Sequence, residues 1–162
     1  MQKETILEGK RILIADDEED ILDTLRELLP MCKVDTALSY EEAENLLENN
    51  EYDAAILDIM GIRGYDLLQI TQNNNIPALM LTAHAFTKEN LKKSFEKGAW
   101  YYAPKEKMDM IGDFLSDVLE ARDKNKNIYV NWYKRLSRFC EDRFNTVLMN
   151  ENPEFWGSLL KY

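Results

Sequence analysis

The sequence has few of the features that mark secreted, metal-binding or membrane proteins. Its two cysteines, Cys32 and Cys140, are far apart and show no metal-ligand spacing, so we expect reduced, structural thiols. No apolar run approaches the roughly 18 residues that a membrane span requires. The first five residues lack the apolar core of a signal peptide. We therefore expect a cytoplasmic protein that does not insert into a membrane.

Excess basic charge is also missing. The net charge is −10, and it is unevenly placed, because residues 1–122 carry −12 whereas residues 123–162 carry +2. Protein surfaces that bind DNA are usually basic and clustered. This distribution argues against nucleic acid as the main partner of the chain.

What the sequence does contain is a set of short apolar runs that end in polar side chains. Runs of this kind are typical of strands buried on both faces of a parallel sheet. The carboxyl ends of such strands meet at one edge of the sheet, where ligands bind in doubly wound folds. The runs and the residues that follow them are 11–15 before Asp16-Asp17, 54–57 before Asp58, and 78–81 before Thr82.

Strand and helix patterns alternate five times along residues 1–122, which predicts an α/β domain with a five-stranded parallel sheet and helices on both faces. The first ten residues are polar, and we expect them to have little order. The expected strands are 11–15, 33–37, 54–57, 78–81 and 99–103. The expected helices begin near residues 18, 40, 64, 88 and 108.

Residues 123–162 follow as a C-terminal helical segment. Its apolar residues keep helical spacing from Ile128 to about Met149, before a turn and a short last piece. About 40 residues are too few for an independent core, so this segment must pack on the first domain or on a partner. Its aromatic residues fit either packing or a docking surface.

The polar residues at the strand ends suggest phosphoryl chemistry. The carboxylates of Asp16, Asp17 and Asp58 are hard oxygen ligands suited to Mg²⁺. Asp58 could then attack phosphorus and form an aspartyl phosphate. Lys105 could pair with that phosphate, and the Thr82 hydroxyl could donate a hydrogen bond to it.

Each of these residues also has an ordinary structural interpretation. Asp16 and Asp17 could be acids at a helix start, and Thr82 could be a plain strand-end hydroxyl. Tyr102 could be core, next to Trp100 and Tyr101. Lys105 could be solvated, as we expect for Lys107, and we expect the single histidine, His84, to be exposed. The predicted convergence at one sheet edge favours the functional interpretation.

Four segments together resemble the receiver domain of response regulators, over roughly residues 8–122. They are Ile14-Ala15-Asp16-Asp17-Glu18, Leu57-Asp58-Ile59-Met60, Leu81-Thr82-Ala83 and Pro104-Lys105. The resemblance implies a flavodoxin-like sheet of order 2-1-3-4-5. It also implies that a sensor histidine kinase or a phosphotransfer protein phosphorylates Asp58, and that the protein is not an enzyme.

The resemblance assigns further roles to matched positions. Mg²⁺ would be held by Asp16, Asp17, Asp58 and the backbone carbonyl of Met60. Lys105 would contact the phosphoryl group. Thr82 would turn toward it, with Tyr102 moving inward behind Thr82. The output would be a changed contact with a protein partner, or a homodimer.

Two departures from the family pattern leave an alternative open. The loop after Asp58 is short and lacks the usual proline, and Glu106 stands where the family has a cis proline after the lysine. We expect the Lys105–Glu106 bond to be trans, because non-proline cis bonds cost about 2.5–4 kcal/mol. The alternative is a degenerate receiver that acts as a phosphorylation-independent adaptor or dimerisation module. An aspartate-dependent phosphatase is disfavoured, because Met60 stands where such enzymes carry a second acid.

Overall fold

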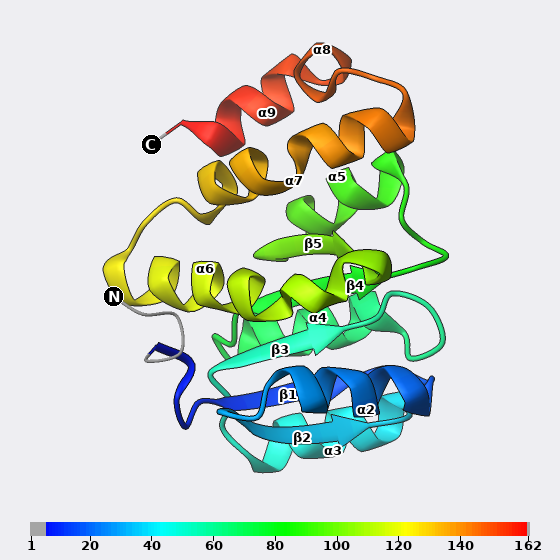
Figure 1. Cartoon of the computed structure of the whole chain (residues 1–162), viewed down its shortest axis with the longest axis vertical. Helices are drawn as coiled ribbons and strands as arrows, with labels where there is room; N and C mark the ends of the chain where they lie inside the picture. Colours follow the sequence, from blue (N-terminus) through cyan, green and yellow to red (C-terminus); the bar gives the residue numbers. More distant parts are fainter. Residues whose placement is uncertain (1–5, 162) are drawn as a thin grey trace.

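The computed structural model describes residues 6–161, and its centre is a five-stranded parallel sheet (Figure 1). The strand order is β2-β1-β3-β4-β5, as predicted. Strand β3, at the centre of the sheet, and its neighbour β4 are buried along their whole length. The strands are β1 Arg11–Ala15, β2 Lys33–Ala37, β3 Ala54–Leu57, β4 Ala78–Thr82 and β5 Tyr101–Pro104.

Helices cover both faces of this sheet, with α2 and α6 on one face and α3, α4 and α5 on the other (Figure 1). Side chains cap two of the helix starts, since Ser39 accepts from the Glu42 amide and Thr87 from the Asn90 amide. These helices are α2 Glu19–Leu28, α3 Tyr40–Asn49, α4 Gly64–Asn73, α5 Lys88–Glu96 and α6 Ile111–Lys124, and the 3₁₀ helix η1 Lys105–Met110 precedes α6. No helix within residues 6–161 is both long and apolar enough to cross a membrane.

Three expectations need correction. The lead-in is not without order throughout, because Leu7 is helical and wholly buried, although residues 1–5 lie outside the described part. Strand β5 begins at Tyr101 and not at Ala99. The long C-terminal helix ends at Phe144, because Asn145 adopts the left-handed conformation and stops it.

Three C-terminal helices, α7 Ile128–Phe144, α8 Leu148–Glu151 and α9 Pro153–Leu160, lie beyond the β5 edge of the sheet (Figure 1). Helix α7 contacts β5 and α6, and α9 packs on α7. Trp132 of α7 is wholly buried, with its ring edge-on to Phe95 of α5 and stacked on Trp156 of α9. The segment therefore packs on the rest of the chain, one of the two arrangements that its length allowed.

Candidate functional site

Two buried carboxylates and one buried ammonium group meet at the carboxyl end of the sheet. Asp16 follows β1, Asp58 follows β3 and Lys105 follows β5, so three separate strands place them there. The Lys105 Nζ lies 2.7 Å from Asp16 Oδ2 and 3.2 Å from Asp58 Oδ2. Exposure is 3% for Asp16 and 7% for both Asp58 and Lys105. The predicted convergence of these three residues is present.

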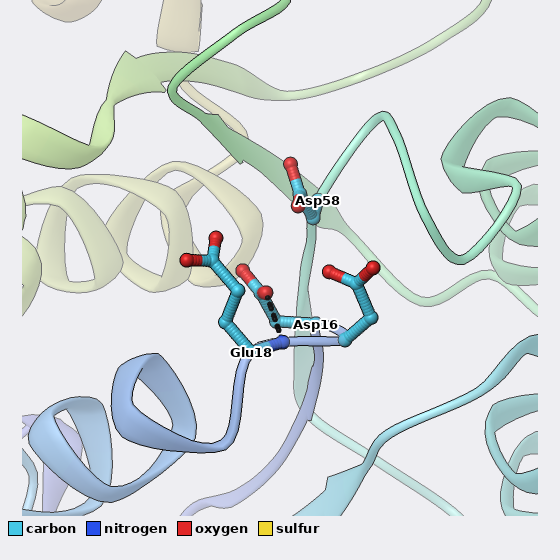
Figure 2. Close-up of side chains that lie close together, drawn as sticks. Asp16, Glu18 and Asp58 are labelled. Atoms are coloured by element: carbon cyan, nitrogen blue, oxygen red, sulfur yellow. Dashed lines mark hydrogen bonds between the residues drawn. The ribbon is translucent and has the colours of Figure 1, made fainter.

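A third acid, Glu18, belongs to the same cluster, although we had expected it only at a helix start (Figure 2). Its Oε2 lies 3.0 Å from Lys105 Nζ, and its backbone amide donates to Asp16 Oδ1 at 2.9 Å. This hydrogen bond from the Glu18 amide explains the position of Glu18, because it folds the residues after β1 into a turn that precedes α2. A carboxylate directly after Asp16-Asp17 was the sequence signal for it.

Burial and charge compete in setting the pKa values of this cluster. Burial raises the pKa of Asp58 and of Asp16, because a buried carboxylate loses the hydration of its charged form. Hydrogen bonds and charge from Lys105 oppose that rise. Burial also lowers the pKa of Lys105, but Asp16, Glu18 and Asp58 together outweigh it and raise that pKa above its ordinary value. One lysine therefore compensates several acids at once.

The loop between β3 and α4 packs closely against Asp17 and the Asp58 backbone. Gly61 has a φ of +88°, and a side chain there would collide with the Asp17 carboxylate. A side chain on Gly64 would collide with the backbone oxygen of Asp58. The short loop thus depends on two glycines, and the Met60 side chain points outward with 57% exposure.

The acids could hold a metal ion. Asp16, Asp17, Glu18 and Asp58 each offer a carboxylate oxygen, and these oxygens all lie within 4.8 Å of one another. Hard oxygen donors at such spacing suit Mg²⁺.

Thr82 and Tyr102 lie behind the cluster. Thr82 is buried, and its Oγ1 makes no hydrogen bond of good geometry within residues 6–161; a weak polar interaction of this hydroxyl with the Asp58 carboxylate comes last among the effects that lower the pKa of Asp58. Tyr102 is wholly buried, and its hydroxyl donates to the Ala85 carbonyl at 2.9 Å and accepts from the Thr87 amide at 3.0 Å. An unpartnered hydroxyl beside a carboxylate is free to bond to an incoming oxygen.

Three neighbouring residues complete the comparison with the sequence. His84 is exposed, as expected. Lys107 is not fully solvated, because its Nζ lies 5.0 Å from the centroid of the Phe139 ring, whose position the sequence did not reveal. The Lys105–Glu106 bond is trans, as expected, since no described peptide bond is cis.

We expect Asp58→Asn to stabilise the metal-free protein at pH 7 by about 1 kcal/mol. The folded pKa of Asp58 lies above its ordinary value of 3.8, so its contribution favours folding below that value and is lost as the pH rises through the folded pKa. The charged group costs stability at pH 7, and asparagine removes this cost. Urea unfolding at pH 7 and near pH 4, without Mg²⁺, measures the difference.

The stabilisation should be present at pH 7 and clearly smaller near pH 4. Asp23→Asn, which changes an exposed aspartate of α2, is the matched control and should have little effect at either pH. A destabilised Asp58→Asn protein at pH 7 would contradict the assigned balance of burial and charge.

Comparison with known proteins connects this site to a family. The family model of the response regulator receiver domain matches residues 12–112. The chain is 40% identical over 116 residues to the uncharacterized transcriptional regulatory protein YrkP of Bacillus subtilis. That alignment covers 69% of this chain and 47% of YrkP. It is 33% identical over 100 residues to the heme response regulator HssR of Staphylococcus haemolyticus. This second alignment covers 59% of this chain and 44% of HssR.

The chain therefore spans about half the length of these curated relatives. Among solved structures, a CheY-like response regulator receiver domain protein from Methanospirillum hungatei aligns with a TM-score of 0.66 and 27% identity. That alignment covers 72% of this chain and 98% of the other. The strand order, the acid–lysine cluster and the family match agree, and the chain belongs to the response regulator receiver domain family of two-component signalling.

Proposed function

We propose that Asp58 accepts a phosphoryl group from a phosphohistidine on a sensor histidine kinase or a phosphotransfer protein. A carboxylate oxygen of Asp58 forms a bond to phosphorus while the phosphorus–nitrogen bond breaks, and the released histidine takes up a proton. The observation that carries the proposal is the contact of Asp58 with Lys105, 3.2 Å apart in a buried site. Lys105 would turn from its carboxylate partners to the oxygens of the phosphoryl group.

The proposal includes a divalent ion. Asp16, Asp17 and Asp58 are the acids that would hold Mg²⁺, together with the backbone carbonyl of Met60. When bound, the ion neutralises charge that develops on the phosphoryl oxygens. The crowding of Glu18 with these three acids supports the proposal, because a second cation would relieve repulsion that Lys105 alone balances.

Thr82 and Tyr102 are the residues through which the site would change shape. The free Thr82 hydroxyl would donate to a phosphoryl oxygen and draw in the segment that follows β4. Tyr102 is bonded to that segment at Ala85 and Thr87, so it would respond to the movement. A single change of charge at Asp58 would in this way bias a two-state element.

The output would be a changed protein–protein contact. We propose a signalling module without a catalytic reaction of its own, located in the cytoplasm, where kinases form phosphohistidine from ATP. The acidic charge of residues 1–122 gives no support to a nucleic-acid partner. In this proposal, residues 1–122 form the receiver domain and residues 123–162 form a separate C-terminal helical segment.

The test is phosphorylation by acetyl phosphate in the presence of Mg²⁺, followed by the mass of the intact protein. We expect one added phosphoryl group on the wild-type protein and none on Asp58→Asn. Omitting Mg²⁺ should also prevent the addition. Asp23→Asn is the matched control and should be phosphorylated normally.

The possible outcomes distinguish a phosphorylated receiver from an adaptor and from a phosphatase. The same mass gain in wild type and in Asp58→Asn would place the phosphoryl group elsewhere and overturn the proposal. No gain with acetyl phosphate or with a kinase would favour a phosphorylation-independent adaptor. Release of product from a phosphoester, dependent on Asp58, would indicate a phosphatase.

A further inference from the structure

The outer edge of β5 is covered by helix α7 of the same chain. Strand β5 is the last strand of the sheet, so its outer side carries unpaired backbone groups. Trp132 Nε1 donates to the carbonyl oxygen of Tyr102 at 2.7 Å, and the Tyr129 hydroxyl donates to that of Ala99 at 3.2 Å. Helix α7 therefore provides donors for the carbonyl of Tyr102, the residue to which we assign a switching role, and for that of Ala99, three residues before it.

An aromatic contact joins the segment after β4 to the far end of α7. Phe86, four residues beyond Thr82, stacks on the Tyr102 ring with centroids 5.1 Å apart. The Phe86 ring also lies 5.9 Å from that of Phe139 and 5.2 Å from that of Phe144. Movement of the segment behind Asp58 would shift a ring that α7 packs against.

A second connection runs through the residue next to Lys105. Glu106 Oε1 lies 2.5 Å from Arg143 Nη2 in the last turn of α7. The Arg143 guanidinium also lies 5.0 Å from the centroid of the Phe139 ring. Glu106 stands at the position where the sequence departs from the family proline, and here its side chain contacts α7.

Ion pairs hold the flanks of the same surface. Arg135 of α7 pairs with Asp117 of α6 at 2.8 Å, and Glu151 of α8 pairs with Lys88 of α5 at 2.8 Å. The C-terminal helices thus contact α5, β5, α6 and η1. The face that these four elements form is therefore covered by the C-terminal helices of the same chain.

We propose that α7 is an internal ligand of this face and that phosphorylation of Asp58 loosens it. The inference rests on the proposed function, and it adds a regulated contact that the function does not require. Lys105 and the segment after β4 would both shift toward a phosphoryl group. The contacts of Glu106 and Phe86 with α7 fit the arrangement without that group, so the shift weakens them.

Because coupling between two events is reciprocal, loosening α7 by mutation also strengthens binding at Asp58. The two measurements below test both directions. Beryllofluoride with Mg²⁺ serves as a stable stand-in for the phosphoryl group, and both experiments use the full chain.

The first measurement is amide hydrogen exchange across α7. Adding beryllofluoride and Mg²⁺ should speed exchange of residues 128–144 by at least about five-fold. Exchange in α3, which lies at the other end of the sheet, should change little. Asp58→Asn should show no response to the same addition.

The second measurement is the affinity of two charge-matched variants for beryllofluoride. Arg143→Gln removes the pair with Glu106 and should raise the apparent affinity by about two- to five-fold, the range expected for an exposed ion pair. Arg138→Gln makes the same change at an exposed position five residues earlier on α7, and should leave the affinity unchanged.

The outcomes separate this inference from the function on which it rests. No phosphoryl addition to Asp58 would overturn both. Addition to Asp58 with unchanged or slower exchange in α7 would overturn the inference alone. Equal affinities of Arg143→Gln and Arg138→Gln would likewise overturn the coupling.

Discussion

Replacing Lys105 with methionine is expected to destabilise the protein by about 3–5 kcal/mol at pH 7, the cost of leaving a buried ion pair without its partner. Asp16 and Asp58 would stay buried without the ammonium group that lies 2.7 and 3.2 Å from them. Urea unfolding of the metal-free protein measures the loss.

The pH dependence of this loss follows from the same carboxylates. Without Lys105, the folded pKa values of Asp16 and Asp58 rise further above 3.8, because Lys105 provides the largest of the effects that oppose burial. The cost is therefore present at pH 7 and shrinks as the pH falls through the raised folded pKa values, and it is lost only below 3.8, where the carboxylates are protonated in the folded and in the unfolded state. Mg²⁺ should restore part of the lost stability at pH 7.

Lys107→Met is the matched control, two residues further along η1. Its ammonium group has a cation–π contact with Phe139, and its loss should cost about 0.5–1 kcal/mol. A Lys105→Met protein no less stable than Lys107→Met would show that the acids do not depend on Lys105.

Trp132→Ala is expected to weaken the docking of the C-terminal helices by about 3–5 kcal/mol, the usual cost of truncating a buried aromatic residue. The Trp132 side chain is wholly buried between Phe95 and Trp156, and its Nε1 donates to the Tyr102 carbonyl. Truncation removes ring contacts on both sides and leaves that carbonyl without its donor. Limited proteolysis should show faster cleavage within residues 125–161.

Trp132→Phe provides the comparison, because it keeps an aromatic ring and loses the Nε1 donor. It should cost about 1 kcal/mol, as for one hydrogen bond, together with some packing. If Trp132→Ala left the cleavage rate of the C-terminal helices unchanged, the described contacts would not be what holds them in place.

The sheet was predictable because its strands are nearly unbroken apolar runs. Ala54–Leu57 consists of four apolar residues and is buried throughout. A strand with one exposed face would alternate apolar and polar residues, which this run does not. Strand β2 was predictable from its place in the alternation rather than from its pattern, because it lies at the sheet edge and is mostly half-buried. The order of the strands came from the family resemblance, since apolar patterns do not say which strands are neighbours.

The candidate site was predictable where residues follow strands and less so elsewhere. Asp16, Asp58 and Lys105 each follow a strand end, so the topology alone brings them together. The contact of Glu18 with Lys105 depends on the turn before α2, which the sequence pattern does not determine. The contact of Arg143 with Glu106 depends on where α7 docks, and helical spacing does not say which surface a helix meets.

The loop after Asp58 has a consequence for reading sequence variation in this chain. Neither Gly61 nor Gly64 carries a functional group, yet any larger residue would strike Asp17 or the Asp58 backbone. Variants at these two positions would thus disturb the acid cluster, and with it the phosphoryl acceptance that we propose, while every charged residue stayed intact. A comparison restricted to reactive side chains would therefore miss the effect of such a variant.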